Sequence, residues 1–92
     1  MEIDRLTIER IKEAADIVDV VSEFVTLKRA GSKYKGLCPF HNDSNPSFYV
    51  TPSLGICHCF TCGEGGDSVG FIMKHEQMSY VEALRWLANR YG

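Results

Sequence analysis

Long apolar runs are missing from this sequence. No apolar stretch in its 92 residues approaches the roughly 20 residues that a helix needs to cross a bilayer, and neither end carries a lipidation motif. The N-terminus, Met1 to Asp4, is acidic and lacks the charged and then apolar regions of a secretory signal peptide. We therefore expect a cytoplasmic protein that does not bind a membrane.

Internal repeats, low-complexity tracts and linkers are also missing, and the chain is short. Its 92 residues fall below the usual domain size of roughly 100–150 residues, so we expect a single domain over residues 1–92. A chain of this length buries only about 60–65% of its unfolded surface, which leaves it marginally stable unless a metal, disulfides or a partner contributes. Without a secretion signal, its four cysteines are expected to be reduced, which favours a metal over disulfides.

Acidic residues are missing from one stretch of the chain. The formal net charge is -2, but residues 24–42 contain no acid and four bases, whereas residues 1–23 contain seven acids and three bases. Because a local basic stretch can bind phosphates whatever the average charge, the net charge does not exclude a nucleic-acid partner. The four bases are Lys28, Arg29, Lys33 and Lys35.

Helical and strand patterns follow one another between turn signals, which predicts an α+β fold with a small antiparallel sheet. Apolar residues at three-to-four spacing predict a first helix around residues 8–15, and the glycine-rich run at residues 63–66 is expected to break regular structure. The residues placed to cap the later helices are Asp16, then Asp67 or Ser68, then Ser79 with Glu82 as its capping-box partner. The predicted strands cover residues 24–28, 34–38, 47–50 and 56–59.

Two pairs of metal-binding residue types stand seventeen residues apart. Cys38 and His41 form the first pair, Cys59 and Cys62 form the second, and each pair encloses two residues. This spacing is typical of zinc sites built from two C-x2-C pairs, with one cysteine replaced by histidine. Three cysteines and a histidine fill all four tetrahedral positions, so we expect one structural zinc and no catalytic metal.

Other residues near these pairs leave alternatives open. Cys57 could in principle replace Cys59 as a ligand, but the spacing of the ligand pair favours Cys59. In a strand the two cysteines share one face, so we expect Cys57 to pack beneath the site as a buried thiol. His58 then points to the other face. No catalytic residue is predicted, because there is no phosphate-binding glycine loop and the nearby acids come without a supporting motif. These acids are Asp43, Glu64 and Asp67.

The basic stretch also carries aromatic residues. Proteins usually hold a single nucleic-acid strand in a basic groove with aromatic faces on which bases stack. Phe48 and Tyr49 face opposite sides of their strand, and the tyrosine, whose hydroxyl prefers water, is the candidate for stacking. His58 could bond a base or a phosphate. The alternative is that the four basic side chains only keep an exposed strand edge soluble. The candidates are Lys28, Arg29, Lys33, Tyr34, Lys35, Tyr49 and His58.

Four segments together resemble a known family. They are residues 17–21 (IVDVV), 36–42 (GLCPFHN), 45–48 (NPSF) and 59–67 (CFTCGEGGD). In this order they closely resemble the zinc-binding domain of bacterial, DnaG-type DNA primases, and the resemblance covers essentially the whole chain. It implies a zinc ribbon, a small antiparallel sheet flanked by helices, with Cys38, His41, Cys59 and Cys62 as the ligands.

The resemblance also implies a role in DNA replication. Such a domain would bind the single-stranded DNA template, help select the initiation site, and regulate primer synthesis with the neighbouring RNA polymerase domain, in cis or in trans. A replicative helicase would contact the full-length primase. The nucleotidyltransferase chemistry, that of a DNA-directed RNA polymerase, would need Mg²⁺ in a catalytic domain that this chain lacks. We therefore expect the chain to be the N-terminal part of a longer primase and to be inactive alone.

Two departures from the family pattern and three rival assignments complete the sequence evidence. The loop at residues 43–45 reads Asp-Ser-Asn, where the family commonly has an acid, a lysine and a threonine, and Cys57 stands where the family commonly has an aromatic residue. The initiation sequence is therefore open. The first two rivals are a phage or mobile-element primase-helicase and a transcription-type zinc ribbon that contacts proteins. The third, a metalloenzyme, would require an open zinc position.

Overall fold

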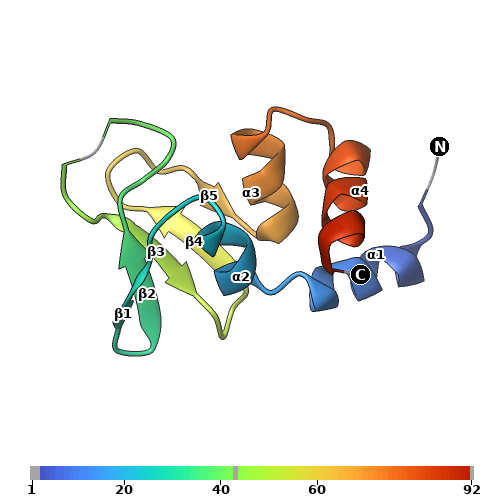
Figure 1. Ribbon diagram of the computed structural model, residues 1–92, viewed down its shortest axis with the longest axis horizontal. Helices are drawn as coiled ribbons and strands as arrows, with labels where there is room; N and C mark the ends of the chain where they lie inside the picture. The colour runs from blue at the N-terminus through green and yellow to red at the C-terminus, as the bar shows by residue number, and fades with distance from the viewer. Residues whose placement is uncertain (1–2, 43, 92) are drawn as a thin grey trace.

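A computed structural model describes residues 3–42 and 44–91. It contains helices and a small antiparallel sheet, as the sequence predicts; the sheet has five strands, and α3 stands between it and α4 (Figure 1). Across the described residues, no helix has both the length and the apolar character needed to cross a membrane. The helices are α1 (Arg5–Ala14), α2 (Ile17–Ser22), α3 (Ser68–His75) and α4 (Tyr80–Tyr91). The strands are β1 (Lys28–Ala30), β2 (Lys33–Gly36), β3 (Phe48–Thr51), β4 (Ile56–Cys59) and β5 (Gly65–Gly66).

The strands lie in the sheet in the order of the chain, each antiparallel to the next. In the register of β3 and β4, Phe48 lies opposite Cys59 and Val50 lies opposite Cys57. Directly opposite residues share one face of a sheet, and these four side chains are all buried. They form the inner face, which packs into the core, and the residues between them form the outer face.

The hydrophobic core fills the space between the inner face and the helices. Val20 and Val21 of α2, Phe71 and Ile72 of α3 and Leu84 of α4 are all at most 1% exposed. Each of these helices turns one apolar stripe toward the sheet or toward another helix, as the three-to-four spacing predicts. One contiguous cluster therefore joins all four helices to the sheet.

The predicted helix caps are confirmed. The carboxylate of Asp16 accepts the backbone N–H groups of Val18 and Asp19. Asp67, and not Ser68, caps α3, because its carboxylate accepts the N–H of Gly70 at 2.8 Å. Ser79 and Glu82 form a reciprocal capping box, in which the N–H of Ser79 donates to Oε1 of Glu82 at 2.9 Å and the N–H of Glu82 donates to Oγ of Ser79 at 3.2 Å.

Two strand predictions are wrong. The predicted strand at 24–28 begins only at Lys28, because the N–H groups of Phe24 and Val25 still donate to the carbonyl of Val21 at the end of α2. The run at 63–66, predicted to be irregular throughout, contains β5. Its glycines pair with Cys57 and His58. Glycine has a low strand propensity, so this strand depends on close packing and not on its own residues.

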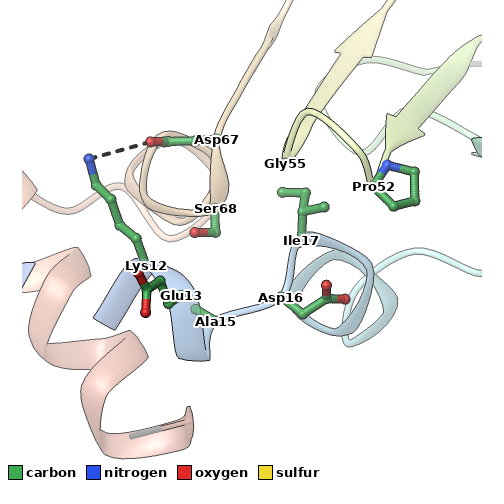
Figure 2. Close-up of a pocket in the computed structure, with 9 residues that line it drawn as sticks. All are labelled: Lys12, Glu13, Ala15, Asp16, Ile17, Pro52, Gly55, Asp67 and Ser68. Atoms are coloured by element: carbon green, nitrogen blue, oxygen red, sulfur yellow. Dashed lines mark ion pairs between the residues drawn. The ribbon is translucent and has the colours of Figure 1, made fainter. Parts of the chain in front are cut away.

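Polar contacts hold the helices to one another at two junctions. Between α1 and the start of α3, Lys12 forms an ion pair with Asp67 at 3.8 Å, beside a small hollow of about 250 Å³ that the buried Ala15 also lines (Figure 2). At the far end of α4, the guanidinium of Arg90 donates to Glu23 at 2.8 Å, and the hydroxyl of Tyr91 bonds the same carboxylate. Hydrogen bonds from Arg90 and then Tyr91 hold the pKa of Glu23 below its usual range.

We expect Gly65→Ala to lower the free energy of unfolding by about 1–3 kcal/mol, the usual cost of overpacking. A Cβ at Gly65 would lie 2.3 Å from the carbonyl oxygen of Cys57, so β5 would have to separate from β4. Urea unfolding in excess zinc measures the effect. Gly70→Ala is the control, since within 4 Å its added carbon would meet only a carboxylate oxygen of Asp67, at 3.3 Å, and no backbone. Equal unfolding midpoints for both variants would contradict the prediction.

Candidate metal centre

Two tight turns carry the predicted ligand pairs, and we call them the first and second knuckle. The first follows β2 and holds Cys38 and His41; the second follows β4 and holds Cys59 and Cys62. In each knuckle a backbone N–H donates to the sulfur of the first cysteine. The nitrogen of Phe40 lies 3.4 Å from the sulfur of Cys38, and the nitrogen of Cys62 lies 3.5 Å from the sulfur of Cys59. Gly63 then leaves the second knuckle with φ at +79°, a conformation that favours glycine.

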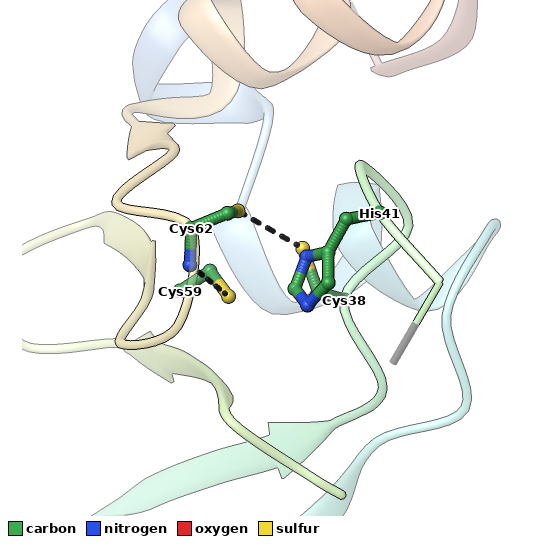
Figure 3. A group of neighbouring side chains, drawn as sticks. All are labelled: Cys38, His41, Cys59 and Cys62. Carbon is green, nitrogen blue, oxygen red and sulfur yellow. Dashed lines mark hydrogen bonds between the residues drawn. The ribbon is translucent and has the colours of Figure 1, made fainter. Parts of the chain in front are cut away.

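The two knuckles meet at one point. Figure 3 shows Cys59 and Cys62 facing Cys38 and His41, and the four ligand atoms all lie within 4.8 Å of one another. The sulfurs of Cys38 and Cys62 are 3.7 Å apart. A tetrahedral zinc with Zn–S bonds of roughly 2.3 Å places two sulfurs about 3.8 Å apart. The cluster therefore fits one zinc ion with a closed ligand set.

The electrostatics of the cluster also suit a divalent cation. Burial, and after it the neighbouring sulfurs, raises the pKa of Cys38 to about 12. Burial also opposes the ionisation of Cys59, but the N–H groups of Cys62 and Thr61 outweigh it and lower the pKa of Cys59 to about 6. The hydroxyl of Ser47 acts in the same direction. Three thiolates this close repel one another, and a dication among them removes that repulsion.

The neighbours of the second pair lie where the sequence places them. Cys57 is 2% exposed, shares the inner face with Cys59, and stands outside the four-residue cluster. Its thiol donates to the carbonyl of Gly66 at 3.4 Å, and burial raises the pKa of Cys57 to about 11. His58 is exposed on the outer face. The expected buried thiol is confirmed.

The acids near the knuckles have structural partners. Glu64 forms an ion pair with Lys74 at 2.5 Å, and the amine of that lysine lies 5.9 Å from the centre of the Phe40 ring. Asp67 caps α3. Asp43 lies outside the described residues. Neither Glu64 nor Asp67 joins the metal cluster.

The outer face gathers five of the seven residues predicted to bind DNA. Lys28 lies opposite Lys35, Lys35 opposite Tyr49, and Tyr49 opposite His58, so these four form one row across β1 to β4. Lys33 stands two residues before Lys35 in β2 and therefore shares the face. We call these five residues the outer row.

The other two predicted contacts lie on the opposite side of the hairpin. Arg29 and Tyr34 pair across β1 and β2, and the guanidinium lies 6.0 Å from the centre of the tyrosine ring. Tyr34 packs partly against the core. The guanidinium of Arg29 also donates to the carbonyl of Gly31 at 3.1 Å. The structure does not bring this pair together with the outer row.

Phe60 is a surface residue that the sequence reasoning missed. It lies in the second knuckle between the two cysteines and is 66% exposed. Its ring meets those of Tyr49 and His58 edge-on, with centroids 5.4 Å and 5.0 Å away. Together with Lys33 these rings border a hollow of about 380 Å³ on the outer face. Its position between two ligands was not a sufficient signal, because Phe40 stands between the ligands of the first knuckle and packs against two phenylalanine rings of the core.

Comparison with known proteins identifies the family. Residues 3–92 match the family described as the CHC2 zinc finger, the zinc ribbon of DnaG. The chain belongs to this family. Among proteins similar to this CHC2 zinc finger, the DNA primase of Thermotoga maritima is 56% identical over 90 residues, which cover 98% of the chain and 16% of that protein. The DNA primase of Mycobacterium tuberculosis is 56% identical over 86 residues, which cover 92% of the chain and 14% of that protein.

A solved structure agrees with this assignment. The crystal structure of the Aquifex aeolicus primase, with its zinc-binding and RNA polymerase domains, matches this CHC2 zinc finger with a TM-score of 0.88 at 50% identity. The match covers 94% of the present chain and 21% of that one. The family and the zinc-ribbon fold that the sequence resemblance implied are thus confirmed. The chain spans only 14–16% of the length of the two primases compared above.

We expect the purified chain to hold one zinc, and Cys59→Ala to lose it while Cys57→Ala keeps it. Both variants remove a buried thiol from β4, but only Cys59 belongs to the cluster. Elemental analysis of the dialysed proteins, normalised to protein concentration, gives the zinc content. The opposite ranking would show that Cys57 is the ligand.

Removal of the metal is expected to unfold the region of the knuckles. In small zinc peptides the binding free energy is on the order of 10 kcal/mol and is largely folding free energy. Circular dichroism and amide hydrogen exchange, before and after a chelator is added in excess, should show loss of protection in β2 to β4. A metal-free protein with unchanged spectrum and Tm would contradict this expectation.

Proposed function

We propose that this zinc-binding domain of a DNA primase binds the single-stranded DNA template on the outer face of its sheet and helps select the site where RNA primer synthesis begins. The outer row carries the proposal, because it places three lysines beside an aromatic and a histidine side chain on one exposed surface. The zinc, held by Cys38, His41, Cys59 and Cys62, has a structural role in this proposal: it fixes the strands that carry the row.

The arrangement suits a single strand that crosses the sheet. Lys28 and Lys35 lie opposite each other in β1 and β2, at one end of the outer row, where they can neutralise phosphates. At the other end the half-buried ring of Tyr49 lies beside the exposed ring of Phe60, and aromatic rings stack on bases with about 1–3 kcal/mol per base. His58 adds a polar group next to Phe60. Phosphate contacts would supply affinity and contacts with base edges would supply sequence preference.

Primer synthesis itself requires the rest of the primase. The Aquifex aeolicus primase structure contains an RNA polymerase domain as well as a zinc-binding domain, and we propose that the present domain acts with such a domain, in cis or in trans. Mg²⁺ would belong to that catalytic domain. The replicative helicase would contact other parts of the full-length protein. The isolated chain is then expected to bind template and to synthesise no primer.

Titration of a fluorescently labelled single strand at several salt concentrations tests the proposal. Lys33→Ala and Lys35→Ala should each weaken binding and flatten the plot of log affinity against log salt by roughly 0.7, the value for one phosphate contact on a single strand. Lys12→Ala, which removes the same charge from α1, is the matched control. Phe60→Ala should cost about 1–3 kcal/mol of binding free energy without changing the slope.

Two outcomes would count against the proposal. Affinity that is indifferent to salt and to both lysine substitutions would exclude the outer row as a template site. Equal losses in Lys12→Ala and Lys35→Ala would show that the domain attracts DNA through its overall charge and not through this face.

A further inference from the structure

Ser47 makes three contacts with the second knuckle from the residue just before β3. Its hydroxyl oxygen lies 3.7 Å from the sulfur of Cys59. The same oxygen accepts the hydroxyl of Thr61 at 2.9 Å. Its backbone carbonyl accepts the N–H of Phe60 at 3.0 Å. One residue from outside the knuckle thus touches three consecutive residues of it.

The direction of these hydrogen bonds follows from the chemistry of the sulfur. A zinc-binding cysteine is a thiolate and has no hydrogen to donate, so in the pair of Ser47 and Cys59 the serine is the donor. Thr61 donates to Ser47 in turn. The two hydroxyls therefore form a short chain whose hydrogens point toward the sulfur, and each bond polarises the next.

This contact differs from the others made by the ligand sulfurs. The N–H groups of Phe40 and Cys62 reach the thiols of Cys38 and Cys59 from within their own knuckles, as any such turn allows. Ser47 belongs to a different segment and brings a side-chain donor across from β3. Cys59 is fully buried, and a charged sulfur in such a place gains most from a hydrogen bond.

We propose that Ser47 is a positioning residue of the metal centre. Its hydroxyl stabilises the thiolate of Cys59 and fixes the second knuckle against β3, while its carbonyl fixes the backbone of Phe60. Groups that orient metal ligands in this way typically change metal affinity by about 10–100-fold when they are removed. The inference rests on zinc binding at the four-residue cluster, which the zinc content of the unmodified chain measures separately, and it does not depend on DNA binding.

Competition with a chromophoric chelator measures the effect on zinc affinity. Ser47→Ala is expected to weaken zinc binding by about 10-fold or more while the saturated protein still holds one ion. Ser47→Thr keeps the hydroxyl and should restore most of the affinity. Ser53→Ala, in the exposed turn between β3 and β4, is the matched control and should bind zinc as the unmodified chain does.

Replacement of zinc by Co²⁺ separates a bond to the sulfur from a general loss of structure. A hydrogen bond lowers the energy of the sulfur lone pair, so its loss should move the sulfur-to-cobalt charge-transfer band to longer wavelength in Ser47→Ala, and Ser47→Thr should move it back. Thr61→Val leaves Ser47 in place and should shift the band less, in the same direction. This second variant gives the answer even if Ser47→Ala does not fold.

The proposal fails in either of two cases. Unchanged affinity in Ser47→Ala would show that the hydroxyl does not support the metal centre. Lower affinity with an unshifted cobalt band in Ser47→Ala and Thr61→Val, or a band that Ser47→Thr does not restore, would assign the serine a purely structural role. An unmodified chain without zinc would instead overturn the metal assignment itself.

Discussion

The convergence of two short turns on one point is the constraint on which this domain depends. The first knuckle follows β2 and the second follows β4, so the ligand cluster ties together both ends of the segment that contains β3. Closing that segment in the unfolded chain costs conformational entropy, which metal binding offsets. A chain of 92 residues has a small core, and a single ion that fixes three adjacent strands adds the stability that the core alone does not provide.

The same constraint decides what the outer face displays. In β4, Cys59 faces inward to the cluster, while its neighbour His58 faces outward. A slip of one residue in the register would exchange the two faces, and it would also pull the cysteine away from the other ligands. The metal centre therefore holds the lysines and aromatic rings of the outer row in place although it lies on the opposite side of the sheet.

Sequence reasoning succeeded where local chemistry decides and failed where packing decides. Ligand spacing and helix caps such as Asp67 depend on a few neighbouring residues, and both were predictable. Spacing favoured Cys59 over Cys57 as the ligand, but both face inward, and only the tertiary structure shows that the thiol of Cys57 bonds the carbonyl of Gly66. The strand at Gly65 could not be predicted from the sequence, because it forms through close packing against β4 and not through the strand propensity of its glycines. The exposure of Phe60 likewise depends on where the knuckle ends.

The strand order has a consequence for how the domain is assembled. Every strand pairs only with the strands that precede and follow it in the chain, so no pairing has to wait for a distant segment. Contacts between residues close in sequence form quickly, and all four ligands precede α3. During synthesis the sheet can therefore close around its ion before α3 and α4 have emerged from the ribosome.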